Sequence, residues 1–126
     1  MSNSLVAIAI DCADAPAVAR FWVDVLGRQV AEDSTSEHVI LLAGDGDTNW
    51  PLITFNTVPE PKIVKNRVHL DLTTSAADRD QEIERLLALG ARRVDVGQTG
   101  TESWTVLADP EGNEFCVVRP KETLTR

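Results

Sequence analysis

The chain has 126 residues, 43% of them hydrophobic, and its 12 basic and 20 acidic side chains give a formal net charge of -8. This length and apolar content predict a single globular domain over residues 1–126 with a core of its own. The negative charge argues against nucleic acid or an anionic membrane surface as a partner, and no apolar run approaches the roughly 20 residues that span a bilayer.

The first half of the chain is predicted to form a strand, a helix and three short strands. Residues 5–11 (LVAIAID) are typical of a strand. Residues 15–27 are typical of a helix, because Pro16 suits a first helical turn and Gly27 suits a stop. Apolar side chains recur at helical spacing within it: Val18, Phe21, Trp22 and Val25. Three further strands are expected at residues 28–34, 37–44 and 51–58.

The second half repeats this order of elements. A strand is predicted at residues 67–74 (RVHLDLTT), a helix at residues 76–90, and three more strands at residues 91–96, 103–108 and 114–120. The helix has an apolar stripe, formed by Ile83, Leu86, Leu87 and Gly90. Its other face is expected to be solvated, and carries Arg79, Asp80, Glu82 and Arg85.

The two halves also resemble each other in their letters. FWVDVLGR (21–28) is similar to ERLLALGA (84–91), and AIAIDCAD (7–14) is similar to HLDLTTSA (69–76). Internal duplication explains both pairs. The sequence therefore predicts two β-α-β-β-β modules, at about residues 4–60 and 65–120.

The strand RVHLDLTT alternates apolar and polar side chains. As a strand, it places Val68, Leu70 and Leu72 on one face and His69 and Asp71 on the other. The polar face can turn to bulk water, and then neither side chain has a chemical role. It can also line a cavity, and then His69 lies where a ligand or metal would lie.

A family resemblance follows from four segments: FWVDVLG, NRVHLDL, LLALGA and WTVLADPEGNEFCVV. They resemble the vicinal-oxygen-chelate superfamily, and within it the glyoxalase-like and bleomycin-resistance-like members. The likeness runs over residues 5–120, and the turn at residues 109–113 is its most specific motif. It implies an α+β fold whose two modules form an open, cup-shaped mixed sheet with the helices outside and a ligand inside. It also implies a homodimer.

The same resemblance implies a divalent metal held by His, Glu or Gln on the first and last strands of each module. His69 matches one of these positions, and Ala7 stands at its counterpart in the first module. Cys116 stands where the usual Glu lies, and residues 54–56 offer no charged ligand. A catalytic ion normally needs about three protein ligands. We therefore expect no cofactor and no family metal, with a divalent ion on His69, Cys116 and Glu114 kept as an alternative.

The residues expected to contact a small-molecule ligand are His69, Asp71, Trp50, Trp104, Glu114, Cys116 and Asn56. The alternative for the aromatic residues is ordinary packing. The alternative for His69 is a structural histidine, whose tautomer Asp71 would hold. Cys116 is expected to be an inert buried thiol, and His38 a surface residue.

Two features of the sequence predict the cellular compartment: the N-terminal residues and the number of cysteines. The first residues, MSNSLVAIAIDC, lack the basic start and long apolar stretch of a signal peptide. Cys12 and Cys116 are too few for a disulfide framework. We expect a cytoplasmic protein with two free thiols.

The leading functional hypothesis is that the protein sequesters a cationic or aromatic compound, like resistance-type members of the superfamily. The first alternative is an enzyme: a lyase, isomerase or dioxygenase with His69 as a metal ligand, or a metal-free isomerase or hydrolase. In the metal-free case His69 would act as an acid/base with Asp71 or Glu114. The second alternative is a vestigial cup with a role in dimer-mediated interaction.

Overall fold

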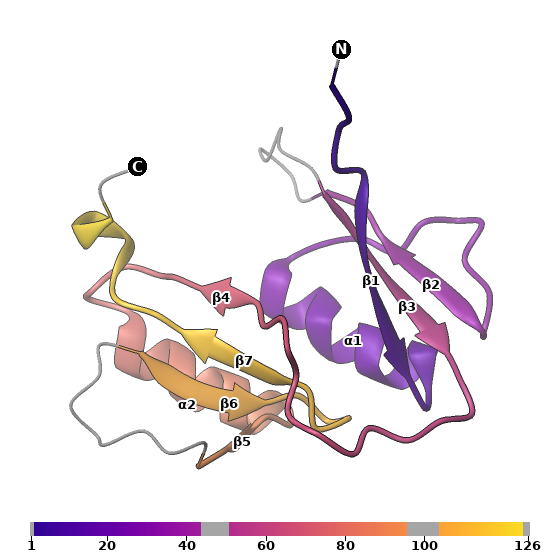
Figure 1. Cartoon of the computed structure of the whole chain (residues 1–126). Helices are drawn as coiled ribbons and strands as arrows, with labels where there is room; N and C mark the ends of the chain where they lie inside the picture. Colours follow the sequence, from indigo (N-terminus) through magenta and orange to yellow (C-terminus); the bar gives the residue numbers. More distant parts are fainter. Residues whose placement is uncertain (1, 44–50, 96–103, 125–126) are drawn as a thin grey trace. The chain divides into compact units, whose positions relative to one another are not determined.

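The computed structural model describes residues 2–43, 51–95 and 104–124. The chain divides into two compact units, Met1–Lys62 and Ile63–Arg126. Within the described residues, each unit contains one α-helix and one small mixed sheet (Figure 1). The predicted α+β fold class is confirmed, and the shared cup stays a prediction of the family resemblance. No helix in the described ranges is long and apolar enough to cross a membrane.

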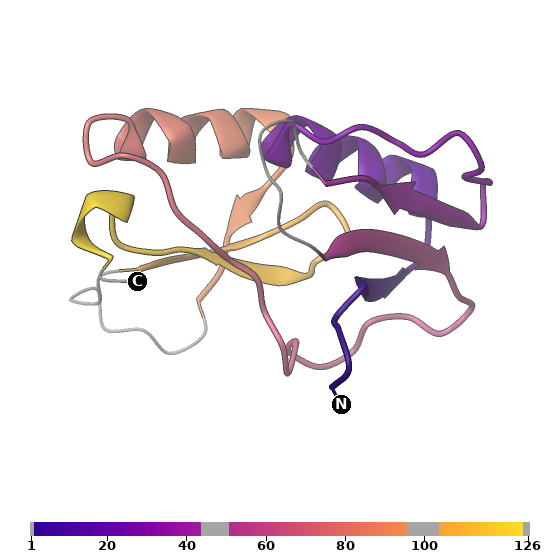
Figure 2. The same ribbon diagram turned by 90° about the horizontal axis from the view of Figure 1, so that it is seen from above.

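The first unit consists of β1 (Ala7–Cys12), α1 (Ala15–Leu26), β2 (His38–Leu41) and β3 (Leu52–Thr57). Its sheet has the order β1-β3-β2, with β1 parallel and β2 antiparallel to the central β3. Figure 2 shows α1 lying along one face of this sheet. The buried side chains between helix and sheet include Val18, Trp22, Leu41 and Phe55.

Helix α1 has nearly the predicted limits, because both of its ends are set by local residues. The Asp14 carboxylate accepts a hydrogen bond from the Ala17 N–H at 3.1 Å, which satisfies one free donor of the first turn. Gly27 ends the helix with a φ of 65°, a left-handed conformation that favours glycine.

The prediction of a strand at residues 28–34 is wrong. Its only strand-like pairing in the described residues is an isolated bridge between Val30 and Leu41. The Ala31 N–H still donates to the Ile40 carbonyl at 2.8 Å, and the Leu42 N–H to the Gln29 carbonyl at 2.9 Å. The chain therefore follows β2 for only a few residues before it turns away, which is too short for a ladder.

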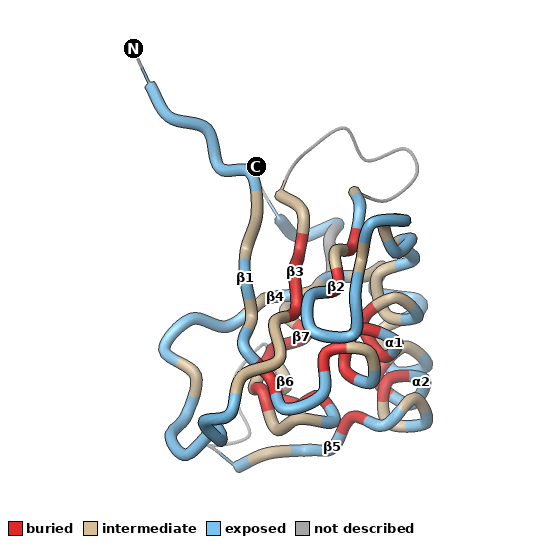
Figure 3. Tube along the Cα trace, turned by 90° about the vertical axis from the view of Figure 1, so that its right-hand side faces the viewer, coloured by how far each residue is buried: buried red, intermediate tan, exposed pale blue. Residues whose placement is uncertain are grey.

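The second unit keeps the complete order of a β-α-β-β-β module. Its elements are β4 (Asp71–Leu72), α2 (Arg79–Leu89), β5 (Arg92–Arg93), β6 (Thr105–Ala108), β7 (Glu114–Val117) and the 3-10 helix η1 (Lys121–Thr123). The sheet order is β4-β7-β6-β5, with β4 parallel to β7. Among the strands, the longest buried runs lie on β3 in the first unit and on β6 and β7 in the second (Figure 3).

The strand predicted at residues 67–74 is reduced to the two residues of β4. Leu70 and Leu72 are half-buried, as expected for an inward face, but Val68 is 77% exposed. The pairing with β7 begins where the Cys116 N–H donates to the Leu70 carbonyl at 2.9 Å. Residues before Leu70 therefore belong to an irregular segment and not to the sheet.

Helix α2 begins at Arg79, three residues later than predicted. Ile83 and Leu86 are buried, as the apolar stripe requires. Arg79 was expected on the solvated face, and this is wrong. Its guanidinium donates to the carbonyls of Val118 at 3.3 Å and Val117 at 3.2 Å. The first turn of α2 therefore lies beside the end of β7, and the arginine links the helix to that strand.

The turn between β6 and β7 is built around a buried carboxylate. Asp109 is only 1% exposed. Its Oδ1 accepts hydrogen bonds from the N–H groups of Glu111 and Asn113, both at 2.9 Å, and its Oδ2 accepts one from the Asn113 side chain at 3.1 Å. Gly112 supplies the left-handed φ of 87° that the turn requires. This network sets the β6–β7 register, which pairs Val106 with Cys116.

Replacing this carboxylate should destabilise the fold strongly. The change Asp109→Ala leaves three donors in or beside a buried turn without their acceptor. We expect the free energy of unfolding to fall by about 2 to 4 kcal/mol, measured by urea denaturation followed with circular dichroism. The exposed Asp33→Ala is the control, with an expected change of about 0.5 kcal/mol or less. Equal losses in both variants would contradict this account of the turn.

Candidate functional site

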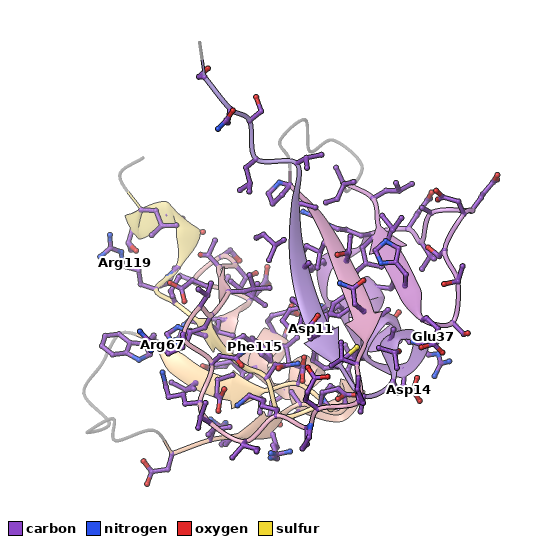
Figure 4. All side chains as sticks on the ribbon, turned by 45° about the vertical axis from the view of Figure 1, so that its right-hand side comes forward. Asp11, Asp14, Glu37, Arg67, Phe115 and Arg119 are labelled. Carbon is purple, nitrogen blue, oxygen red and sulfur yellow. The ribbon has the colours of Figure 1, made fainter. Side chains whose placement is uncertain are left out.

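A cavity of about 380 Å³ lies within the second unit, and we call it the His69 cavity. Its lining residues are Lys65, His69, Asp71, Trp104, Val106, Glu114, Cys116 and Val118. Strand alternation explains much of this set, because Glu114, Cys116 and Val118 are every second residue along β7 and its continuation. Phe115, labelled in Figure 4, alternates with them and therefore lies on the opposite face of the strand. Its side chain is only 1% exposed.

Five of the seven residues expected to contact a ligand line this cavity: His69, Asp71, Trp104, Glu114 and Cys116. Asn56 does not line it. It lies on β3 in the first unit, where its Oδ1 contacts Nδ1 of the exposed His38. Trp50 lies outside the described residues. The other three lining residues were not among those expected to contact a ligand: Lys65, Val106 and Val118.

Three side chains that can ligate a metal meet in the cavity. One potential ligand atom from each of His69, Asp71 and Cys116 lies within 4.8 Å of the other two. The parallel register pairs Asp71 on β4 with Cys116 on β7, and His69 precedes Asp71 by two residues. We call these three residues the His69 cluster.

Lys65 contacts the cluster through its histidine. Its Nζ lies 2.9 Å from Nε2 of His69. An ammonium group can only donate, so Nε2 accepts and the ring proton lies on Nδ1 in this arrangement. One alternative expected from the sequence was that Asp71 holds the tautomer of His69, and the residue at Nε2 is Lys65.

The segment that carries Lys65 and His69 is anchored on β7. The backbone N–H of Asn66 donates to Oε1 of Glu114 at 2.9 Å, and the Asn66 side chain donates to the Glu114 carbonyl at 3.4 Å. The Glu114 carboxylate is therefore engaged in positioning this segment. Within the described residues, Asp71 and not Glu114 completes the close donor set with His69 and Cys116.

The thiol of Cys116 is poorly suited to act as a nucleophile. It is 8% exposed, and burial raises its pKa above the ordinary value of 9.0. The negative charge of Asp71 and a hydrogen bond to Asp71 raise the pKa further, while Lys65 lowers it. The thiol is therefore protonated at neutral pH, and a metal would have to displace this proton to bind sulfur.

The donor set of the cluster indicates which metals it suits. An imidazole, a carboxylate and a thiolate are typical ligands of zinc-class ions, and three protein ligands with an open position match a catalytic zinc site. Manganese and magnesium prefer oxygen ligands, of which only Asp71 offers one here. The cluster fits zinc better than manganese.

Comparison with known proteins gives a family and a fold. A family model described as a glyoxalase-like domain matches residues 7–118. No curated protein matches the chain. A solved glyoxalase/bleomycin resistance protein/dioxygenase family enzyme from Burkholderia phytofirmans PsJN is 23% identical, with a TM-score of 0.70 over 93% of this chain and 98% of its own.

Two further solved structures show the same fold at lower identity. A mutant of the fosfomycin resistance protein FosX from Listeria monocytogenes, complexed with Mn(II) and 1S,2S-dihydroxypropylphosphonic acid, is 16% identical. Its TM-score is 0.72, over 96% of this chain and 93% of its own. A possible glyoxalase from Bacillus cereus is also 16% identical, with a TM-score of 0.69 over 93% of this chain and 99% of its own.

The raised pKa of Cys116 leads to a test by alkylation. In a Cys12→Ser background Cys116 is the only thiol, and its reaction with iodoacetamide should be slow at pH 8 because little thiolate is present. Adding Asp71→Asn removes the carboxylate that raises the pKa, so alkylation at pH 8 should become several-fold faster. Asp11→Asn in the same background is the control and should not change the rate. An unchanged rate in the Asp71 variant would show that burial alone protects the thiol.

Proposed function

The chain belongs to the glyoxalase-like domain family, and from this premise we propose that it binds a small organic molecule in the His69 cavity without the family's metal. The observation that carries the proposal is the convergence of five expected ligand-contacting residues on one cavity. Its volume of about 380 Å³ lies in the range of roughly 300 to 1,000 Å³ that small-molecule sites occupy.

The lining supports a ligand with a flat or apolar body. Trp104 is 44% exposed and borders the cavity together with Val106 and Val118. An exposed indole beside two aliphatic side chains offers a surface on which an aromatic ring can bury much of its area. A tryptophan used only for packing would be more completely covered, as Trp22 is at 2% exposure.

The charges of the lining support a basic group on that ligand. Among the lining residues the two carboxylates of Asp71 and Glu114 outnumber the single ammonium of Lys65, and the whole chain has a net charge of -8. A negative protein raises the local concentration of cations and their association rate. A protein that holds such a compound stoichiometrically, and releases it unchanged, would act by sequestration.

Binding is tested by isothermal titration calorimetry with cationic aromatic compounds, bleomycin and ethidium included. Trp104→Ala should weaken binding by about tenfold through lost ring contact, and Asp71→Asn by a similar factor through lost charge. Asp11→Asn, on the first unit, should bind as the unchanged protein does. The proposal fails if no cationic compound binds while neutral dicarbonyl compounds do.

A second candidate function is metal-dependent catalysis, which the His69 cluster favours. His69, Asp71 and Cys116 would hold a zinc-class ion, and such an ion supplies a Lewis acid that polarises a substrate oxygen. The chain's own residues would then orient the substrate, with Trp104 beside it and the Asn66–Glu114 hydrogen bonds keeping His69 in place. Cys116 would have to lose its proton when the ion binds.

The variant His69→Ala separates the two functions. An enzyme that depends on this imidazole should lose about a hundredfold or more in the rate of a glyoxalase-type isomerisation assay. A sequestering protein should show no such activity before the change and should lose about 1 to 2 kcal/mol of ligand affinity after it. His38→Ala replaces the other histidine, which is exposed in the first unit, and should alter neither quantity.

A further inference from the structure

Lys65 is the only lining residue of the cavity that carries an ammonium or guanidinium group, and this positive charge lies at the cluster. Lys65 places its Nζ 2.9 Å from Nε2 of His69. Its influence extends to the sulfur as well, because Lys65 opposes the rise in the pKa of Cys116. Lys65 therefore acts on at least two of the three residues that could ligate an ion.

We propose that Lys65 excludes divalent cations from the His69 cluster by serving as its built-in cation. The proposal holds for whichever organic molecule the cavity binds. It makes Lys65 the residue that determines whether this cavity accepts a metal ion.

Lys65 occupies the imidazole nitrogen that a metal ion would use. The lone pair on Nε2 of His69 accepts the hydrogen bond from Lys65. A metal that used this nitrogen would need the same lone pair, so Lys65 would have to move away first. With Nδ1 protonated, the other ring nitrogen offers no lone pair in this tautomer.

The positive charge of Lys65 also opposes the binding of a cation. A dication at the cluster would lie within a few ångströms of the Lys65 ammonium, and like charges at that distance repel strongly even with solvent screening. Lys65 and Asp71 both line the cavity, so the ammonium offsets part of the negative charge that would attract a cation. Without the ammonium, the cluster would contain a carboxylate and an ionisable thiol with no cation beside them.

The backbone at Lys65 is held in position through its neighbour Asn66. Asn66 donates two hydrogen bonds to Glu114 on β7, at 2.9 and 3.4 Å. These bonds fix the backbone directly after Lys65 against the sheet that carries Cys116. The lysine stem therefore starts from a defined point beside the cluster, although its side chain is exposed.

The test is calorimetric titration of the full chain with Zn²⁺ alone. The unchanged protein should bind Zn²⁺ weakly, and Lys65→Leu should bind it at least about tenfold more tightly, because a positive charge and a competing hydrogen bond are both removed. Lys65→Arg keeps the charge and should remain weak. Lys62→Leu removes a lysine from the first unit and should match the unchanged protein.

A second set of variants locates the gained affinity. In the Lys65→Leu background, Cys116→Ser and His69→Ala should each abolish the gain. The proposal is overturned if Lys65→Leu binds Zn²⁺ no more tightly than the unchanged protein, if Lys65→Arg gains as much as Lys65→Leu, or if the gain survives both second changes. Circular dichroism of each variant confirms that it is folded. A failed screen of organic cations would overturn the proposed function and leave the Zn²⁺ result unaffected.

Discussion

The buried carboxylate of Asp109 is the constraint on which the rest of the site depends. Three hydrogen bonds to it close the turn between β6 and β7 and set the pairing of Val106 with Cys116. Five of the eight lining residues of the His69 cavity lie on this hairpin or its immediate continuation. Because β4 pairs with β7, Asp71 takes its place opposite Cys116 from the same register. A shift of one residue in the turn would send Glu114 and Cys116 to the other face of the sheet.

The chemistry of the cavity follows from how its charges compensate one another. Asp71 raises the pKa of Cys116, and Lys65 opposes that rise while it binds His69. The result is a polar wall with a protonated thiol, a carboxylate and an ammonium close together, next to the apolar surface of Trp104. Such a wall suits recognition of an organic molecule, whereas a metal site would require the proton and the lysine to leave.

Family membership indicates the fold, whereas the function depends on individual residues. Solved relatives at 16% to 23% identity share the fold over nearly the whole chain. The function depends on what stands at the strand positions that line the cavity. The family resemblance predicts a Glu where Cys116 stands and a metal ligand where Ala7 stands. A donor set with sulfur in place of a carboxylate would change the preferred metal and the ease of binding it.

The sequence alone determined those features that short stretches of chain control. Helix α1 was predicted within one residue because Asp14, Pro16 and Gly27 act locally. The cavity-facing side of β7 was predicted because alternation and the family turn need no knowledge of distant residues. Only the tertiary structure revealed the roles of Lys65 and Arg79. Lys65 lies in an irregular segment anchored by Asn66 to Glu114, 48 residues away, and Arg79 reaches carbonyls 38 and 39 residues away. Helical periodicity and strand alternation describe neighbours in sequence, so contacts over such separations leave no trace in them.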